Sequence, residues 1–233
     1  MQMRKNCAAE PRLAMEAHCG GLLRYYTDFL APAERDEVFM GMAGLPSVAS
    51  PDELGAEVAW ISRQEFMCYR KPCKFRRDQA FMCNEAGVTG YAFSGTEAPR
   101  QPMPPFVEAI MRRVRDATQC AELNACLANC YNAGEGPNGK REAAGKSYIS
   151  QHADDEGGLV RDSPIAAVSC GAVRTFRVTE KAGGKRVLDL KMADGSLLVM
   201  MPGFQRRYKH GVPVEARVKD VRYSLTFRAH AAR

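Results

Sequence analysis

The half of the chain that follows Gln119 consists of short runs of β-forming residues separated by glycine and aspartate turns. The last run, residues 221–228, alternates apolar with polar side chains, which therefore lie on opposite faces of a strand. Residues 197–201 are apolar throughout, as in a strand buried on both faces. A series of short strands like these predicts a β-sandwich or barrel. Further strands are predicted at residues 127–131, 164–170, 175–179 and 187–191.

Two helices are predicted ahead of these strands, which makes the fold class α+β. The first runs from Pro32 to Met42, because proline suits a first turn and acidic side chains favour the positive helix end. The second begins at Pro104 and Pro105, and its apolar side chains recur at helical spacing. The remaining segments are expected to be a partly ordered arm (1–30), a turn-rich linker (47–54), a strand (60–69) and a mobile glycine-rich loop (134–145).

A chain of 233 residues is long enough for one domain with a large core and too short for two of ordinary size. We expect one continuous domain in three parts. These are an N-terminal extension with a helix (1–60), a middle segment with the second helix (61–119) and the β-rich core (120–233). The net charge of +6 permits an anionic partner without requiring one.

The cysteines and the apolar runs indicate the cellular compartment of the protein. Nine cysteines, an odd number with no Cys-x-x-Cys pair and no apolar secretory leader, disfavour a disulfide framework and a structural zinc site. The longest apolar run, residues 197–201, is far too short to cross a bilayer. We expect a protein of a reducing intracellular compartment, the nucleus or the cytoplasm, with no membrane partner. We also expect it to act as a monomer.

A His-x-Asp pattern at His152 and Asp154 is the first sign of a metal site. On a strand both side chains would point to one face, because strand side chains repeat every two residues. With one distant histidine, for which His210 is the candidate, they would form a two-histidine, one-carboxylate triad. Such a triad suits Fe(II) and leaves positions open for co-substrate and oxygen. The pattern alone is weak, since a hydrogen-bonded histidine at a strand end would look the same.

Two arginines on the last predicted strand are a sign that the same fold binds an anion. Arg222 and Arg228 share a face with Ser224 and Thr226, while the opposite face is apolar. If the polar face lines a barrel interior, the arginines require anions. A dicarboxylate such as 2-oxoglutarate would supply them, with one guanidinium binding a carboxylate in bidentate fashion. The alternative is an exposed edge strand with solvated arginines.

Taken in order, these residues resemble the catalytic core of the AlkB family, the Fe(II)- and 2-oxoglutarate-dependent dioxygenases that dealkylate nucleic acids. The resemblance extends over residues 77–228 and is specific, because several motifs occur in the right order. Residues 77–80 and 90–95 are similar to the nucleotide-recognition segment of the branch that repairs duplex DNA. The core motifs are residues 129–131, 152–156, 163–165, 171–174, 195–200, His210 and 222–228.

The resemblance implies a double-stranded β-helix, or jelly roll, with N-terminal helices and a nucleotide-recognition lid within residues 61–119. It implies that Fe(II) is held by His152, Asp154 and His210, and that O2 is the oxidant. It implies a 2-oxoglutarate site made of Asn129, Tyr131, Arg222, Ser224, Thr226 and Arg228, with Arg222 on the distal carboxylate. The implied substrate-binding residues are Arg77, Gln79, Tyr91, Phe93, Asp155 and Glu156.

The chemistry of the implied substrate residues agrees with their roles. Tyr91 and Phe93 could stack on an extruded base. The acidic Asp155 and Glu156 suit a base that alkylation has made cationic. The basic run at residues 70–77 is expected to contact phosphates, which positions a nucleic acid without reading its sequence.

Three features depart from the family pattern. The family usually has asparagine where Ser224 stands, so one hydrogen bond near the co-substrate would be lost or shifted. The loop ahead of His152 is longer than expected, and its residues 134–146 could rim the substrate cleft. No clear match to a duplex-intercalating finger is present. Phe66 and Met67 could form a wedge, with core packing as the alternative.

The sequence thus predicts an oxidative demethylase of N-alkylated bases, 1-methyladenine and 3-methylcytosine, in DNA, RNA or both. The reaction would decarboxylate 2-oxoglutarate to succinate and release formaldehyde. An RNA 6-methyladenine demethylase and a protein hydroxylase on the same core are the enzymatic alternatives. An alternative of another class is a catalytically silent, nucleic-acid-binding barrel, against which the intact triad and arginines argue.

Overall fold

The computed structural model of the 233-residue chain describes residues 13–15, 19–68, 70–93, 96–135 and 140–231. The major sheet contains β1 (Leu13–Met15), β2 (Leu23–Tyr26), β3 (Ser47–Val48), β4 (Trp60–Ile61), β7 (Asp78–Cys83), β8 (Gly90–Phe93), β9 (Thr96–Gln101), β10 (Ala125–Tyr131), β14 (Ile165–Gly171), β17 (Ser196–Met200) and β19 (Arg222–Arg228). The minor sheet contains β13 (Ile149–His152), β15 (Arg174–Glu180), β16 (Arg186–Met192) and β18 (Tyr208–Val212).

Short hairpins and helices complete the described chain. The hairpins are β5 (Glu65–Cys68) with β6 (Lys71–Lys74) and β11 (Gly134–Glu135) with β12 (Arg141–Glu142). The α-helices are α1 (Pro32–Ala43), α2 (Pro105–Thr118) and α3 (Phe204–Arg207). Single 3-10 turns are η1 (Cys19–Gly21), η2 (Pro51–Glu53) and η3 (Ala144–Lys146).

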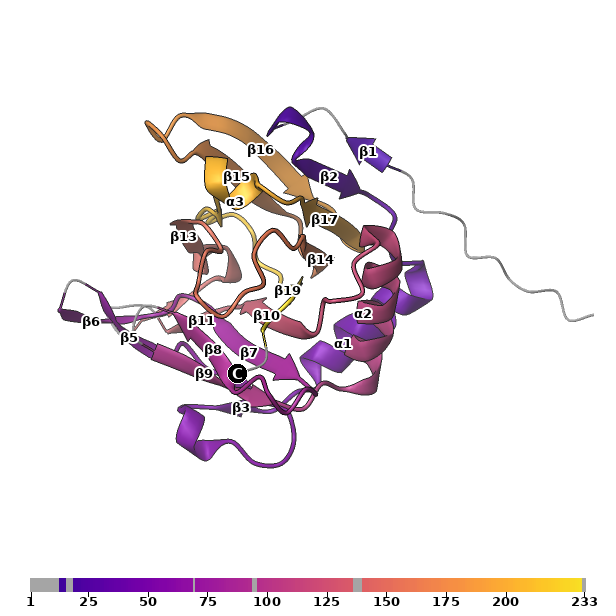
Figure 1. The fold of residues 1–233 in the computed structure, drawn as a ribbon. Coiled ribbons are helices and arrows are strands. Elements are labelled where there is room, and N and C mark those ends of the chain that lie inside the picture. The colour runs from indigo at the N-terminus through magenta and orange to yellow at the C-terminus, as the bar shows by residue number, and fades with distance from the viewer. Residues whose placement is uncertain (1–12, 16–18, 69, 94–95, 136–139, 232–233) are drawn as a thin grey trace, which may run out of the picture.

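The two sheets pack face to face as a jelly roll (Figure 1), which confirms the predicted fold class. The major sheet has the strand order β1-β2-β17-β14-β19-β10-β7-β4-β3, with β8 and β9 attached beside β7. The minor sheet has the order β13-β18-β15-β16. After β13 the chain passes repeatedly from one sheet to the other, so strands that are distant in sequence become neighbours. Buried side chains of both sheets, among them Leu198 and Phe176, form one apolar cluster between them.

Helices α1 and α2 cover the outer face of the major sheet, and both begin at the predicted prolines (Figure 1). Val107, Ile110 and Val114 of α2 belong to one buried cluster with apolar side chains of β10, β14 and β19. Burial of each such side chain stabilises the fold by roughly 1.5–3 kcal/mol. The two helices pack closely at Gly41, where a Cβ atom would lie 2.8 Å from the ring of Phe106.

The last predicted strand is a central strand of the jelly roll, so the edge-strand alternative is wrong. β19 pairs with β14 on one side and β10 on the other, and all its residues are buried. Its apolar side chains belong to the cluster under the helices, as the alternation predicts. Its polar side chains therefore face the interior between the sheets. These are Arg222, Ser224, Thr226 and Arg228.

The strand expected at residues 60–69 is also wrong, because a turn divides it into β4 and β5. Between them the buried Asp78 carboxylate accepts hydrogen bonds from the Ser62 hydroxyl and the Arg63 amide, both at 3.2 Å. Arg63 adopts a left-handed conformation with φ 42°, which turns the chain. A side chain from β7 thus redirects a run whose residue types favour a strand. Residue 69 lies outside the described part of the chain.

Other segments are more ordered than their sequence indicates. Of the expected arm, residues 23–26 form β2, which pairs with β17, while residues 1–12 and 16–18 lie outside the described part. Of the expected linker, residues 47–48 pair with β4. Of the expected mobile loop, β11 pairs with β12, and residues 136–139 are outside the described part. In each case a partner strand supplies hydrogen bonds that the local residue types do not signal, and for β2 that partner, β17, is far away in the sequence.

Arg174 is the largest of the fully buried side chains in the described structure, and it ties a distant loop to the minor sheet. Its guanidinium donates to the Pro213 carbonyl oxygen at 2.8 Å and to the Glu215 carboxylate at 3.2 Å. The Glu215 carboxylate also accepts hydrogen bonds from the Thr175 amide at 2.8 Å and from Lys191. Burial raises the pKa of Glu215, but the hydrogen bonds from Lys191 and Thr175 outweigh it and lower the pKa to about 2.

We expect Glu215→Gln to lower the free energy of unfolding by about 2 kcal/mol at pH 7, because it removes the charge that Arg174 and Lys191 face. Since the folded-state pKa is lowered, this stabilisation is complete above the unfolded pKa of about 4.5 and is lost as the pH falls towards 2. Urea denaturation of both proteins at pH 7 and at pH 3 measures the difference, which should shrink at the lower pH. An equal difference at both pH values would contradict the role of the charge.

Within the described residues, no helix is both long enough and apolar enough to span a bilayer. Most of the described cysteines lie in the interior as free thiols. Cys19, Cys83, Cys126, Cys130 and Cys170 are free and buried.

Candidate metal and co-substrate site

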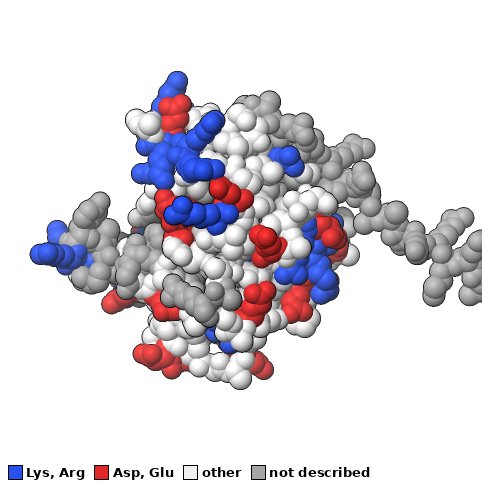
Figure 2. Space-filling model, viewed as in Figure 1, with Lys and Arg blue, Asp and Glu red and all other residues white. Residues whose placement is uncertain are grey.

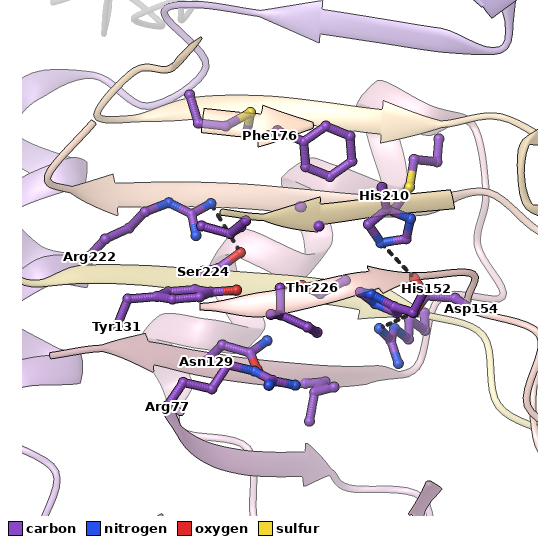
Figure 3. Close-up of a pocket in the computed structure, with 18 of the residues that line it drawn as sticks. Arg77, Asn129, Tyr131, His152, Asp154, Phe176, His210, Arg222, Ser224 and Thr226 are labelled. Carbon is purple, nitrogen blue, oxygen red and sulfur yellow. Dashed lines mark hydrogen bonds and ion pairs between the residues drawn. The ribbon is translucent and has the colours of Figure 1, made fainter. Parts of the chain in front are cut away.

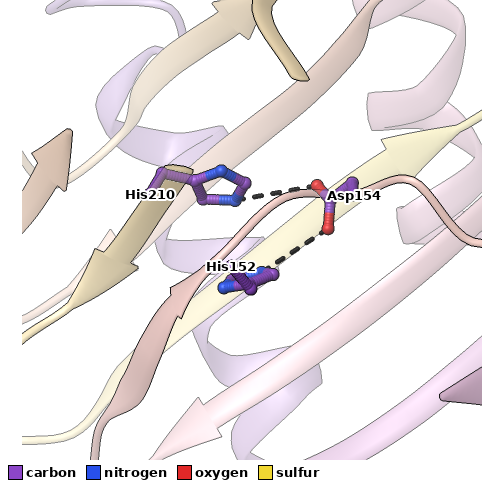
Figure 4. A group of neighbouring side chains, drawn as sticks. All are labelled: His152, Asp154 and His210. Atoms are coloured by element: carbon purple, nitrogen blue, oxygen red, sulfur yellow. Dashed lines mark ion pairs between the residues drawn. The ribbon is translucent and has the colours of Figure 1, made fainter. Parts of the chain in front are cut away.

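Three side chains that could hold a metal ion converge between the two sheets (Figure 4). His152 ends β13, and His210 lies opposite it in β18. Asp154 follows in the loop after β13. Its carboxylate oxygens lie 3.5 Å from Nε2 of His152 and 3.7 Å from Nε2 of His210. One candidate ligand atom from each residue lies within 4.8 Å of the other two.

The sequence argument for this triad placed Asp154 on the same strand as His152, which is wrong. β13 ends at His152, so strand alternation does not orient Asp154. Its place depends on the loop instead, where its amide donates a hydrogen bond of 3.0 Å to Oε1 of Gln205. The structure brings the three predicted residues together, but the geometry that joins them is not a shared strand face.

The electrostatics of the triad favour a bound cation. Burial alone would raise the pKa of Asp154, but the Arg228 guanidinium at 2.9 Å and the two histidines hold it well below its usual range. Burial, with a smaller effect of the neighbouring His152, lowers the pKa of His210 to about 3. At pH 7 the carboxylate is therefore charged and His210 is neutral, the states in which both bind a divalent metal ion.

An unpartnered atom at the triad fits the same donor role. Asp154 Oδ2 is buried without a hydrogen-bond partner among the described residues, and Nε2 of His210 faces it at 3.7 Å. Nδ1 of His152 is 2.9 Å from the Ser150 carbonyl oxygen, and its donation there leaves Nε2 directed at Asp154. Two imidazoles and one carboxylate form a donor set that suits Fe(II).

Polar side chains of β10 and β19 line the cavity beside the triad (Figure 3). Asn129 lies opposite Ser224, and Tyr131 lies opposite Arg222, in the register of the two strands. Because β19 is a central strand, its polar side chains lie in the interior beside those of β10. The cavity thus contains every residue for which the resemblance implied 2-oxoglutarate binding, namely Asn129, Tyr131, Arg222, Ser224, Thr226 and Arg228.

Arg222 is a buried cation in this wall without an ion-pair partner in the described structure. It is 2% exposed, and it donates from Nε to Ser169 Oγ at 2.8 Å and from Nη2 to Ser224 Oγ at 3.4 Å. Its Nη1 is buried without a hydrogen-bond partner among the described residues. Burial lowers the pKa of Arg222, which is the cost that an incoming carboxylate would offset. Ser224 thus accepts a hydrogen bond from Arg222 at the position where the AlkB family usually has asparagine.

Two further arginines of the cavity already have partners. Arg228 donates from Nη2 to Asp154 Oδ1 at 2.9 Å. Arg77 is 5% exposed and donates from Nε to Asn129 Oδ1 at 2.6 Å. Gln79 of β7 donates to the same oxygen at 3.3 Å. Arg77 is therefore buried at the cavity, so it is not one of the phosphate contacts that were expected of the basic run at residues 70–77.

The rest of the predicted basic run is only partly exposed. Arg76 forms an ion pair with Glu142 and is half-buried, because the β11–β12 hairpin packs against it. Phe66 stacks on Phe75 with ring centroids 4.4 Å apart, which favours the packing role over a wedge. The side chain of residue 67 lies outside the described part. The exposed basic residues of this run are Arg70, Lys71 and Lys74.

Tyr91 links the cavity to the loop that carries Asp154. Its hydroxyl donates to Glu156 Oε1 at 2.5 Å, and the Arg228 guanidinium lies 5.1 Å from its ring centre. Asp155 does not line this cavity, and its side chain is 63% exposed. Phe93 lies in β8, but its side chain is outside the described part of the structure.

Phe176, Ser169 and Gln205 contact the site and were not predicted. The ring of Phe176 stacks on that of His210 with centroids 5.1 Å apart. The signal for these contacts is long-range, since β15 meets β18 and β14 meets β19 only in the folded sheets. The alternation of residues 174–180 could have indicated an inward face, but not what that face contacts.

Comparison with known proteins identifies the family to which the chain belongs. The sequence profile of the 2OG-Fe(II) oxygenase superfamily matches residues 23–228. The DNA oxidative demethylase ALKBH2 of Mus musculus is 33% identical over 217 residues, which cover 89% of this chain and 80% of that protein. The alpha-ketoglutarate-dependent dioxygenase alkB homolog 3 of Homo sapiens is 28% identical over 189 residues, which cover 76% of this chain and 59% of that protein.

The fold has a counterpart among solved structures. The structure of OsALKBH1 has a TM-score of 0.59 at 16% identity and covers 89% of this chain and 97% of that one. That likeness shows the fold alone, and the family is decided by the sequence profile match over residues 23–228 and the 33% identity to ALKBH2. The chain belongs to the AlkB family of the 2OG-Fe(II) oxygenase superfamily, and it is a dioxygenase that uses Fe(II), 2-oxoglutarate and O2.

Proposed function

We propose that this dioxygenase removes N-methyl groups from 1-methyladenine and 3-methylcytosine in DNA, RNA or both. 2-Oxoglutarate would be decarboxylated to succinate, and formaldehyde would be released. The observation that carries the proposal is that one cavity contains the triad, Tyr91, whose hydroxyl binds Glu156, and Arg222, which has no ion-pair partner among the described residues. Relatives named as DNA oxidative demethylases, two of them 33% identical, support a nucleic-acid substrate.

His152, Asp154 and His210 would hold the metal ion. When bound, Fe(II) with 2-oxoglutarate and O2 supplies the oxidation of a methyl group to a hydroxymethyl group, which is lost as formaldehyde. The chain keeps the donors in the required states. Arg228 keeps Asp154 charged from 2.9 Å, and the Ser150 carbonyl oxygen holds the proton of His152 on Nδ1, away from the donor atom Nε2.

The polar wall of β10 and β19 would hold 2-oxoglutarate. Arg222 is proposed to bind the distal carboxylate, because its Nη1 is buried and unpartnered among the described residues. Ser169 and Ser224 hold the guanidinium in place before the carboxylate arrives, which lowers the entropy cost of binding. The other proposed contacts are Asn129, Tyr131, Ser224, Thr226 and Arg228.

Tyr91 would border the extruded base. Its hydroxyl is held by the Glu156 carboxylate at 2.5 Å, so the orientation of its ring is restricted. An N-alkylated base that carries a positive charge is attracted to an aromatic face and to a nearby carboxylate. This preference for cationic bases supports 1-methyladenine and 3-methylcytosine over the neutral 6-methyladenine. The remaining proposed substrate residues are Arg77, Gln79, Phe93 and Asp155.

Exposed basic side chains offer contacts for phosphates. Figure 2 shows Lys and Arg gathered over the β5–β6 hairpin and over the turn between β15 and β16. Such contacts position a nucleic acid and make its binding depend on salt. The exposed residues that we assign to this role are Arg70, Lys71, Lys74, Lys185 and Arg186.

A panel of methylated oligonucleotides tests the proposed function. With Fe(II) and 2-oxoglutarate, we expect formaldehyde release from oligonucleotides that contain 1-methyladenine or 3-methylcytosine, and little from 6-methyladenine RNA. Each base is presented in single-stranded DNA, duplex DNA and single-stranded RNA, which also measures the strand preference. Glu156→Gln should slow formaldehyde release from 1-methyladenine and 3-methylcytosine by roughly tenfold or more, since it removes the carboxylate charge that attracts a cationic base.

The other outcomes of the panel identify the alternatives. Faster release from 6-methyladenine RNA than from the cationic bases would favour the RNA demethylase. Bound metal and 2-oxoglutarate without release from any oligonucleotide would favour a protein hydroxylase. Nucleic-acid binding without metal or 2-oxoglutarate binding would revive the silent barrel.

The proposal also includes the cellular compartment and the oligomeric state of the protein. We propose a monomer in a reducing compartment, the nucleus or the cytoplasm. The free, buried thiols support the reducing compartment, and nothing in the proposed site requires a second chain.

A further inference from the structure

The short helix α3 carries Gln205, whose side chain contacts Asp154 of the triad. α3 leads directly into β18, the strand of His210. The Gln205 side chain accepts a hydrogen bond of 3.0 Å at Oε1 from the amide of Asp154. Its Nε2 donates to the sulfur of Met200 in β17 at 3.3 Å. Both ends of this carboxamide are therefore held, one by β17 and the other by the loop of Asp154.

Asp154 depends on such a contact because it lies beyond the end of its strand. β13 ends at His152, and within the described chain Asp154 and Asp155 make no backbone-to-backbone hydrogen bond. The buried amide of Asp154 therefore takes its partner from a side chain. Gln205 thus holds the backbone of Asp154 in place, whereas His152 is held by pairing of its strand with β18.

Lys181 adds a second connection at the same place. Its ammonium group donates to the Gln205 backbone carbonyl oxygen at 3.3 Å and to the Asp155 carboxylate at 2.8 Å. Lys181 follows β15, which pairs with β18. The loop at residues 154–155, helix α3 and the end of β15 are thus joined outside the triad.

We propose that Gln205 is a positioning residue for the metal site, and this rests on the proposed role of the triad. Arg228 holds Asp154 Oδ1 and Gln205 holds the Asp154 backbone, so together they determine where Oδ2 points. Oδ2 faces His210 at 3.7 Å and has no hydrogen-bond partner among the described residues. Gln205 thereby couples the Asp154 loop to the element of His210 before a metal binds. Outer partners of this kind change metal affinity by roughly 10–100-fold.

Titration of the metal-free protein with Co(II), without 2-oxoglutarate, tests the proposal. Gln205→Met removes the acceptor and keeps the length of the side chain. It should weaken Co(II) binding by roughly tenfold or more and alter the visible absorption of the bound ion. Gln205→Glu keeps an acceptor oxygen and should restore the affinity to within about threefold of wild type. The matched control is Arg206→Met, because Arg206 also ties α3 to this loop, at Asp162, but is exposed.

Several results would overturn the proposal. One is equal affinity and absorption in wild type and a folded Gln205→Met. Another is an equal loss in Arg206→Met, which would show general loosening of the loop, and a third is a failure of Gln205→Glu to restore binding. If thermal unfolding shows that Gln205→Met does not fold, Gln205→Asn, one methylene shorter, decides the question in the same titration. Wild-type Co(II) binding by Asp154→Ala would instead refute the metal-site assignment, whatever Gln205 does.

Discussion

The Asp154→Ala protein is expected to release formaldehyde from methylated oligonucleotides about 1000-fold more slowly than wild type, a loss of roughly 4 kcal/mol in transition-state stabilisation. Asp154 supplies the carboxylate of the triad. Its removal also leaves the buried Arg228 guanidinium without the charge that it faces at 2.9 Å. An unpaired cation beside His152 and His210 repels a divalent metal ion. Initial rates with Fe(II) and 2-oxoglutarate measure the effect, and Co(II) titration of the same samples locates it at the metal.

Asp162→Ala is the matched control for this experiment. Asp162 is another aspartate of the loop after β13, but it is exposed and pairs with Arg206. Its variant should keep the wild-type rate to within about twofold, as surface changes usually do. Thermal unfolding of the metal-free proteins confirms that both variants are folded. A wild-type rate in Asp154→Ala would remove the triad from the proposed mechanism.

The Arg222→Met protein is expected to bind 2-oxoglutarate about 100-fold more weakly, a loss of close to 3 kcal/mol. The guanidinium is buried, and its Nη1 has no hydrogen-bond partner among the described residues. Since Arg222 forms no ion pair within the described structure, methionine removes a buried cation without leaving an unpaired anion, and the fold should be kept. Calorimetric titration of 2-oxoglutarate into the Mn(II)-loaded proteins gives the dissociation constants.

Two further variants define the role of Arg222. Arg112→Met is the control, because Arg112 is exposed on α2 and does not line the cavity. It should leave the affinity for 2-oxoglutarate unchanged. Arg222→Lys should fall between wild type and Arg222→Met, since an ammonium group cannot bind a carboxylate in bidentate fashion. Unchanged affinity in Arg222→Met would mean that another cation binds the distal carboxylate, and Arg77 would be the next candidate in the cavity.

Elements whose signals lie within a few residues could be predicted from the sequence. Both α1 and α2 begin at the prolines that predicted them, because proline restricts its own backbone wherever the chain folds. The alternation of residues 221–228 correctly separated the outer apolar face of β19 from its polar inner face. These features depend on neighbours in the chain, so local patterns are sufficient.

Elements that depend on a distant partner could not be predicted. Residues 60–69 favour a strand, but the carboxylate of Asp78 binds the amide of Arg63 and turns the chain. Residues 23–26 carry little pattern and still form β2, because β17 offers them an unpaired edge. Such choices follow from hydrogen bonds between segments that are far apart in sequence, where spacing carries no information.

For the site, the sequence by itself determined which residue types are available: a His-x-Asp pair, one distant histidine and a polar strand face with Arg222. Only the tertiary structure decided how they meet. Pairing of β13 with β18 places His152 opposite His210. Arg228, and not Arg222, neutralises Asp154, which leaves Arg222 available for a carboxylate. The reason is physical: sheet pairing and loop closure bring groups together that the chain separates, and burial then decides which charges must find partners.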